Sequence, residues 1–251
     1  MTATPALLLP DWPAVPGVRA VCTLRRGGIS AAPFDSFNFG QRVGDDAAAL
    51  LQNLQRLTVA AQLPAAPQWL EQVHGMDVAD LDQPGPRRAD AAVTRSAGVV
   101  CAIQTADCLP VLLAAADGSA VAAAHAGWRG LAGGVLAHSV RALRSKATPG
   151  VALQAWLGPA IGPAQFEVGD EVRAVFCAAD AGAVAAFAAN ARGRWLADLY
   201  ALARRALAAE GVTAVSGGGR CTYTETDDFY SYRRAARTGR MASLVWIDPP
   251  T

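Results

Sequence analysis

The sequence predicts an α/β fold of the mixed α+β kind, in which mixed β-sheets are flanked by helices. Segments with helical spacing alternate only in part with short strand patterns, and several strand patterns follow one another directly, so a pure βαβ array is not expected. Hydrophobic residues make up 52% of the chain and charged residues 17%, which is typical of a protein with a large packed core. No repeat or low-complexity linker divides the sequence, so we expect a single domain over residues 1–251.

Three segments carry the apolar spacing of amphipathic helices. The segment 44–63 begins with Asp45 and Asp46, two residues that cap helices well, and continues with leucines at helical intervals. The segment 131–146 repeats this pattern, and the segment 195–211 does so up to Gly211, a residue favoured just beyond the end of a helix. Each of the three is therefore expected to form one helix.

Six short runs are rich in β-branched, aromatic or small apolar residues and predict strands. They cover residues 19–24, 98–103, 109–115, 119–126, 151–158 and 241–247.

Charge and cysteine content exclude several classes of function. The formal net charge is +1 and there is no basic run, so neither nucleic acid nor a membrane surface is an expected partner. No apolar stretch reaches the roughly 18–20 residues of a membrane span, and the N-terminus lacks the basic region of a signal peptide. The five cysteines are odd in number and irregular in spacing, as expected of reduced thiols in a cytoplasmic protein. The sequence makes no prediction of oligomeric state.

A hairpin can be built by hand over residues 109–126. Its turn is Asp117-Gly118, a pair that favours a two-residue hairpin turn. Pairing outward from this turn places Pro110 opposite His125. Cys108 and His125 then lie at the same end of the hairpin and on the same face, within reach of each other. A slip of one residue in this register would separate them.

Cys108, His125 and the histidine of "QVHG", His74, are residue types that bind zinc. Three such ligands leave a fourth coordination position open, which is typical of a catalytic zinc site. Asp107 and Gln72 are candidates to orient the ligands.

Two other kinds of site fit the same residues. Cys108 could be the nucleophile of a cysteine hydrolase, with His125 as its base. Alternatively, two histidines and one cysteine could bind a single copper ion, with Met76 as an axial ligand. A four-copper laccase is excluded, because the chain has only 3 histidines.

The segment after His125 reads "AGWRGLAGGVL", a strand end, a glycine turn and a helix start. Free N–H groups at that helix start could hold an anion, and Arg129 could add a bidentate contact to phosphate or carboxylate. Cys101 lies within an apolar strand and is expected in the core, whereas His138 falls on the polar side of its helix and is expected to be exposed.

Nine short motifs together resemble the YfiH-like family, which has also been labelled a polyphenol oxidase or laccase domain and a peptidoglycan editing factor. The resemblance extends from Arg25 to Ile247, with one departure at Phe39, where the family more often has leucine. The motifs are "RRGGIS", "FNFG", "VGDD", "QVHG", "ADAAVT", "QTADCLPVLL", "AAHAGWRG", "LGPAIGPAQFEVGDEV" and "CTYTETDDFYSYRRAARTGRMASLVWI".

This resemblance implies a fold like that of cysteine hydrolases and the activity of a zinc-dependent purine nucleoside phosphorylase. Such an enzyme splits adenosine, inosine or methylthioadenosine with phosphate and deaminates adenosine. The metal ligands implied are His74, Cys108 and His125, with zinc as the metal and copper as an alternative. Other activities attached to the family name are a cysteine-type hydrolase or amidase acting on peptidoglycan precursors and a single-copper polyphenol oxidase.

With this activity in view, roles can be assigned as hypotheses. We expect the reaction to depend on Cys108, His125, Asp107 and Arg129, and Arg129 also to contact the substrate. Further candidate substrate contacts are Arg26 and Asn38. A wall for purine stacking could come from Tyr223, Phe229, Tyr230, Tyr232, Arg233 and Arg234. Ordinary packing of these aromatic side chains beside surface arginines is an equal alternative.

Overall fold

A computed structural model describes residues 5–250 of the chain. The strands within these residues are β1 (Leu7–Leu8), β2 (Val18–Thr23), β3 (Val78–Asp80), β4 (Ala91–Thr94), β5 (Cys101–Thr105), β6 (Leu109–Ala115), β7 (Val121–Ala126), β8 (Leu153–Leu157), β9 (Glu167–Val168), β10 (Phe187–Ala189), β11 (Trp195–Ala197), β12 (Ala214–Gly217) and β13 (Met241–Ile247). The helices are α1 (Ala47–Ala61), α2 (Trp128–Gly133), α3 (Val135–Lys146), α4 (Asp170–Ala179), the 3-10 helix η1 (Ala181–Ala186) and α5 (Leu199–Ala209).

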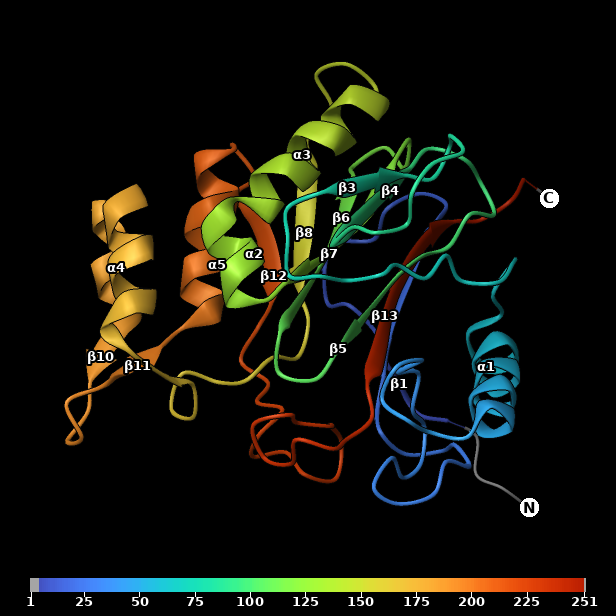
Figure 1. Ribbon diagram of the computed structural model, residues 1–251. Helices are drawn as coiled ribbons and strands as arrows, with labels where there is room; N and C mark the ends of the chain where they lie inside the picture. The colour runs from blue at the N-terminus through green and yellow to red at the C-terminus, as the bar shows by residue number, and fades with distance from the viewer. Residues whose placement is uncertain (1–4, 251) are drawn as a thin grey trace.

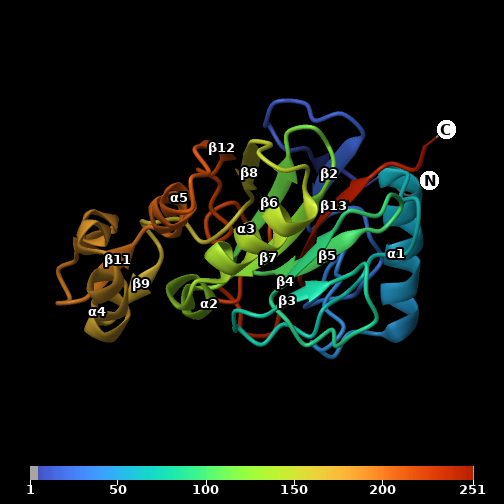
Figure 2. The ribbon, with the colours of Figure 1, turned by 90° about the horizontal axis from the view of Figure 1, so that it is seen from above.

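Two sheets form the middle of the molecule, and helices cover their outer faces (Figure 1). One sheet has the strand order β1-β2-β13-β5, and the other has the order β12-β8-β6-β7-β4-β3. Seen from above in Figure 2, α1 lies outside the first sheet, and α2, α3 and α5 lie outside the second. The second sheet is mixed, because β12 runs parallel to β8 and β3 runs parallel to β4. The predicted mixed α+β class is confirmed.

Side chains that alternate along the strands fill three hydrophobic cores. Along β13, Met241 and Val245 face the core between the two sheets, whereas Leu244 and Trp246 face α1. Along β7, Val121 and Ala123 also face the core between the sheets, whereas Ala122 and Ala124 face the third core, which the helices cover. Because single strands contribute to two cores, we propose that the chain forms one domain.

The hairpin register inferred from the sequence is confirmed. Pro110 pairs with His125 and Leu109 pairs with Ala126. Pro110 is the second residue of β6. Its carbonyl accepts a hydrogen bond from the N–H of Gly158 at 2.9 Å. A proline is therefore tolerated in a central strand because it stands where the ladder begins.

The first predicted helix is confirmed, and the other two need correction. The carboxylate of Asp46 accepts a hydrogen bond from the Ala48 N–H and caps α1. The segment 131–146 is not one helix, because Gly134 with φ at 100° separates α2 from α3. The segment 195–211 begins as the strand β11, and α5 starts only after Asp198, whose carboxylate caps it.

The small sheet β10-β11-β9 and α4, at the far left of Figure 1, were not expected from the sequence. Its strands are two or three residues long, which is too short for a periodic apolar pattern. Among the described residues, no helix has the length and apolar character needed to cross a membrane. All five cysteines are free, as expected, and Cys101 is fully buried.

The only lysine of the chain joins the end of α3 to the edge of the six-stranded sheet. The Nζ of Lys146 lies 2.8 Å from the carboxylate of Asp80 and 2.6 Å from that of Asp82. Asp82 also accepts hydrogen bonds from the hydroxyl of Thr94 and the N–H of Arg95. Burial opposes ionisation of Asp82, but these donors, Lys146 first, hold the pKa of its carboxyl well below the usual range. Burial likewise opposes the charge on Lys146, and the two aspartates outweigh it and raise its pKa.

We predict that Asp82→Asn lowers the free energy of unfolding at pH 7 by about 1–3 kcal/mol, since it removes charge-assisted hydrogen bonds. A carboxyl with a depressed folded pKa stabilises the protein above its unfolded pKa of about 4 and loses that effect as the pH falls further. Urea unfolding measures the free energy of unfolding at each pH. Between pH 7 and pH 3 this free energy should therefore fall less steeply for the variant than for the wild type. Asp227→Asn, which changes an exposed carboxylate, is the control and should keep the pH dependence of the wild type. If Asp82→Asn also kept it, or if both variants changed it equally, the stabilising role of Asp82 would be contradicted.

Candidate metal centre

His74, Cys108 and His125 converge at the open end of the hairpin. Their candidate ligand atoms all lie within 4.8 Å of one another. The Sγ of Cys108 is 3.8 Å from the Nε2 of His74, and the two imidazole rings meet edge to face with centroids 4.8 Å apart. Three residues that are distant in the sequence thus direct their donor atoms at one small volume.

The sheet and one glycine determine this convergence. Cys108 immediately precedes β6 and His125 lies near the end of β7, so the antiparallel register places them at the same end. His74 belongs to the segment between α1 and β3. Gly127 lies beneath all three residues, and an added Cβ there would stand 2.9 Å from His74 and 3.0 Å from the Sγ of Cys108. Only glycine leaves room for the three donors at this position.

One buried carboxylate holds two of the three candidate ligands. The Oδ1 of Asp90 accepts a hydrogen bond from the Nδ1–H of His125 at 2.8 Å and another from the backbone N–H of His74 at 2.9 Å. Its Oδ2 accepts from the N–H groups of Val73 at 3.1 Å and Gly75 at 2.6 Å. Asp90 therefore fixes both the ring of His125 and the backbone that carries His74.

This clamp also explains an uncommon backbone conformation. His74 has φ at 61°, in the left-handed region that costs a non-glycine residue about 1 kcal/mol or more. The three consecutive N–H groups at 73–75 that bind the carboxylate of Asp90 offset this cost.

The charges of the site favour an ionised thiol. Burial by itself would raise the pKa of Cys108, but the imidazoles of His125 and His74 outweigh it and lower that pKa to about 6. Burial would lower the pKa of His125, and the neighbouring Cys108 and Asp90 raise it instead. Both shifts favour a thiolate beside an imidazolium in the metal-free pair.

The donor set fits zinc. Two imidazole nitrogens and a thiolate are ligands that zinc takes, and three protein ligands leave one coordination position for substrate or water. Because Asp90 occupies the Nδ1 of His125, the Nε2 of that ring is the nitrogen free to bind a metal. The space above Gly127, which a Cβ would fill, is where the three donors meet.

A cavity of about 1020 Å³ opens over these residues. His74, Cys108 and His125 form part of its wall, together with Trp69, Trp128 and Tyr232. Its lining also includes Arg42, Arg87, Arg88, Arg129, Arg233 and Arg240, against the two acidic residues Glu71 and Asp107. A cavity of this size and charge is suited to a small ligand with an anionic part.

The sequence over residues 19–248 matches the family described as multi-copper polyphenol oxidoreductase laccase. A purine nucleoside phosphorylase of Pseudomonas aeruginosa is 56% identical over 96% of this chain and 98% of its own length. The purine nucleoside phosphorylase YfiH of Escherichia coli is 50% identical, again over 96% of this chain and 98% of its own. The chain belongs to the YfiH-like family.

Solved structures of YfiH-like proteins share the fold. The crystal structure of protein NMB0706 from Neisseria meningitidis has a TM-score of 0.88 at 45% identity, over 97% of this chain and 99% of that one. The structure of YlmD from Geobacillus stearothermophilus has a TM-score of 0.84 at 31% identity, over 93% of each chain. The predicted resemblance is confirmed over nearly the whole chain.

The three hydrogen bonds found for the carboxylate of Asp107 go to residues other than the candidate ligands of this YfiH-like protein. Its carboxylate accepts hydrogen bonds from the hydroxyls of Thr222 at 2.6 Å and Ser231 at 3.0 Å, and from the N–H of Arg233 at 2.6 Å. The residue thus ties the start of β6 to the loop that carries Tyr232. The carboxylate that contacts a candidate ligand is Asp90 instead.

The other two proposed helpers of the metal also have different surroundings. The side chain of Gln72 exchanges hydrogen bonds with the backbone of Gln104, and so pins the His74 segment to β5. Met76 is not part of the cavity wall, and its sulfur lies against the backbone of Gly133 in α2. The axial ligand considered for copper is therefore directed elsewhere.

Of the expected substrate contacts, Arg129, Tyr232 and Arg233 line the cavity. Arg129 lies in the first turn of α2, which begins after Gly127 as expected. Three others lie outside the cavity wall. The guanidinium of Arg26 is paired with Asp228 at 2.7 Å, and Asn38 and Tyr230 are fully buried.

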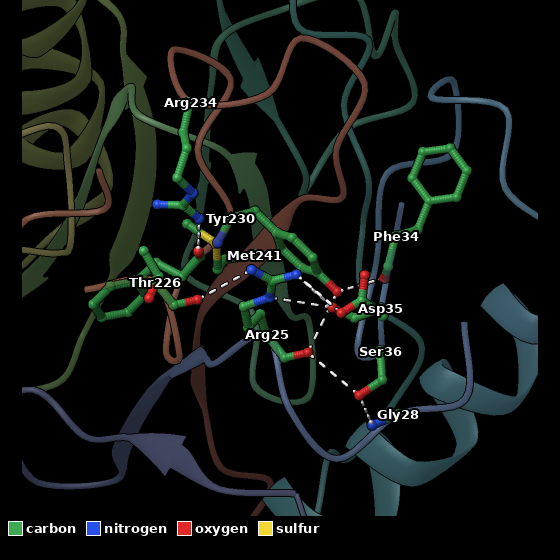
Figure 3. A network of polar contacts seen from close by, with 10 residues as sticks. Arg25, Gly28, Phe34, Asp35, Ser36, Thr226, Tyr230, Arg234 and Met241 are labelled. Atoms are coloured by element: carbon green, nitrogen blue, oxygen red, sulfur yellow. Dashed lines mark hydrogen bonds and ion pairs between the residues drawn. The ribbon is translucent and has the colours of Figure 1, made fainter. Parts of the chain in front are cut away.

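Figure 3 shows what Tyr230 does in the fold. Its hydroxyl donates a hydrogen bond to the carbonyl of Phe34 at 2.7 Å, beside the guanidinium of Arg25. Arg25 in turn contacts Asp35 and the carbonyl of Thr226. Phe229 is also fully buried, so both aromatic side chains serve packing and not purine stacking.

Arg234 and Tyr223 likewise lie outside the cavity wall. The guanidinium of Arg234 donates to the carbonyls of Thr222, Tyr223 and Phe229. These hydrogen bonds hold together the loop over residues 222–234. Tyr223 packs against the core beside the helices. His138 is exposed, as expected.

Three residues of the site were missed by the sequence analysis. Asp90 lies in "ADAAVT", a motif that was noted, but nothing in its spacing showed that it faces His125. Gly127 was read only as a turn residue. Arg240 follows an irregular loop and gave no signal of its own. In each case the role depends on contacts between segments far apart in the chain.

We predict that Asp90→Asn weakens zinc binding by roughly 10- to 100-fold, because the amide cannot accept from His125 and the three N–H groups together. Competition with a chromogenic chelator measures the affinity. The Co²⁺-substituted protein provides a second readout, since displacement of the histidines changes the d–d absorption bands.

The control is Asp198→Ala, which removes the cap of α5 and costs about 1 kcal/mol of stability away from the cavity. This variant should keep the metal affinity and the cobalt spectrum of the wild type. An Asp90→Asn protein that matched the wild type in both measurements would refute the clamp.

Proposed function

We propose that this protein is a zinc-dependent purine nucleoside phosphorylase. The observation that carries the proposal is the convergence of His74, Cys108 and His125 at one wall of an arginine-lined cavity. With zinc bound, such a site would combine a Lewis acid with cationic groups for an anionic reactant. Relatives at 50% and 56% identity carry this enzyme name and support the proposal.

Phosphorolysis exchanges one bond for another at the anomeric carbon of the ribose. The C1′–N9 bond to the purine breaks, and a bond forms between C1′ and an oxygen of phosphate. The proton of hydrogen phosphate ends on the departing base, so that ribose 1-phosphate and free base are the products. The protein must hold two reactants in line and exclude water that would compete with phosphate.

The cavity offers a group for each of these tasks. Zinc bound by His74, Cys108 and His125 would supply Lewis-acid chemistry at this wall. Arg129, at the start of α2, carries a guanidinium suited to phosphate. Tyr232, which is 56% exposed at the cavity, presents an aromatic face on which a purine can stack.

The substrates we propose are adenosine, inosine and methylthioadenosine, with phosphate as the second reactant. We also propose adenosine deamination, in which water replaces the amino group and ammonia leaves. We propose zinc over copper, because Met76 lies outside the cavity wall.

The test incubates the metal-loaded protein with adenosine and phosphate and follows ribose 1-phosphate and ammonia. We predict that a chelator abolishes both products and that added zinc restores them. Cys108→Ser should lose both as well, whereas Cys177→Ser, at a free thiol on α4, should keep them. Formation of neither product by the wild type would refute the proposal.

A cysteine-type hydrolase acting on a cell-wall precursor is a second candidate. It is favoured by the placement of Cys108, His125 and Asp90. The thiol lies within 4.8 Å of a ring nitrogen of His125, and the Nδ1–H of that ring donates to Asp90, an order that suits a nucleophile, a base and an orienting carboxylate. The two candidates differ in their dependence on metal. A hydrolase would remain active after chelation, and an alkylating agent would then form an adduct at Cys108 and stop turnover.

A further inference from the structure

We infer that Arg240 binds the phosphate co-substrate, and that the motif "FNFG" at 37–40 serves to hold Arg240 in place. The inference rests on the proposed phosphorylase function and names a residue for it. Arg240 lies directly before β13 and lines the cavity beside the candidate metal centre.

The guanidinium of Arg240 uses only one of its three nitrogens in hydrogen bonds to the described residues. Its Nη1 donates to the carbonyls of Thr238 and Gly239, both at 2.9 Å. Among residues 5–250, Nε and Nη2 have no hydrogen-bond acceptor, and no carboxylate lies within ion-pair distance. A guanidinium presents its N–H groups as a planar fork that matches two oxygens of one phosphate.

Two other arginines of the cavity have polar partners of their own. Arg42 forms an ion pair with Glu71 at 2.9 Å, and both side chains are exposed. The guanidinium of Arg233 donates to the carbonyl of Glu167. Arg42, Arg233 and Arg129 are exposed. Arg240 differs from them because it is half-buried, and no acidic partner for it lies among residues 5–250.

The guanidinium of Arg240 is partly withdrawn from water and has no directly bonded counter-charge. Burial lowers the pKa of Arg240, while the negative charges of Cys108 and Asp107 nearby raise it. The carboxylate of Asp107 is occupied by Thr222, Ser231 and the N–H of Arg233, so it offers Arg240 no direct bond. A guanidinium in this position has lost hydration that a bound anion would replace.

The backbone of Arg240 is fixed by Asn38, which is fully buried. The side-chain oxygen of Asn38 accepts hydrogen bonds from the N–H of Arg240 and the N–H of Gly40, both at 2.8 Å. The carbonyl of Arg240 accepts from the N–H of Phe39 at 3.1 Å. The amide nitrogen of Asn38 donates to Asp45, which orients it.

Gly40 makes room for the stem of the arginine. A Cβ at position 40 would lie 2.9 Å from the Cγ of Arg240 and 2.8 Å from the Cγ1 of Val43. Phe39 stacks on Trp69, whose side chain belongs to the cavity wall. The motif therefore supports one arginine from several directions, which a packing role alone would not require.

Phosphate is the reactant that these contacts fit. A nucleoside is neutral and gives a half-buried guanidinium no counter-charge, whereas phosphate is a dianion with several acceptor oxygens. It must also react at the anomeric carbon, near the metal ligands. Arg240 lies near Cys108 and can place phosphate there.

The test compares the steady-state kinetics of Arg240→Gln with the wild type, varying phosphate and nucleoside separately. We predict a KM for phosphate raised about 10- to 100-fold, as for loss of a charge-assisted hydrogen bond, and a KM for nucleoside within about twofold. Arg240→Lys keeps the charge and should recover part of the phosphate affinity. Arg237→Gln, in the same loop but outside the cavity wall, should match the wild type.

Two further measurements keep the inference open to refutation. Gly40→Ala leaves Arg240 in the chain but crowds its stem, and it should also raise the KM for phosphate. Calorimetric titration of inorganic phosphate into the wild type and Arg240→Gln measures binding without turnover. A wild type that binds phosphate but cleaves no nucleoside would refute the function and not the arginine. Equal phosphate binding by both proteins would overturn the role of Arg240.

Discussion

The candidate metal centre depends on the hydrogen bonds made by Asp90. A single carboxylate, fully buried, binds the ring of His125 and three consecutive backbone N–H groups around His74. These contacts join the end of β7 to a segment that has no regular structure of its own. Without such an acceptor, the N–H groups would be unsatisfied and the left-handed residue His74 would have no reason to keep its conformation.

The cavity combines this centre with an excess of positive charge. Fixed guanidinium groups in a partly enclosed wall act on a bound anion more strongly than they would in water. The whole chain is nevertheless close to neutral, with a formal net charge of +1. The cationic character is therefore a local property of the site, which overall composition conceals.

The hairpin could be predicted because it is a local structure with a definite turn, and its register brought Cys108 and His125 together. The layered class also followed from the order of strand and helix patterns. Asp90, Gly127 and Arg240 could not be found in this way, since their roles arise from packing between distant segments. Tyr230 shows the reverse case: an aromatic residue next to arginines looked like a binding surface, but its hydroxyl satisfies a buried carbonyl.

The polar stretch "QTADC" marks the point where the chain passes from one sheet to the other, since β5 belongs to the first and β6 to the second. An ion held by Cys108 and by His74, 34 residues earlier, would act as a cross-link across a long loop of the chain. Such a link removes conformational entropy from the unfolded state, as a disulfide does. Metal binding and folding would then be coupled, so that the ion would stabilise the folded chain in addition to taking part in the reaction.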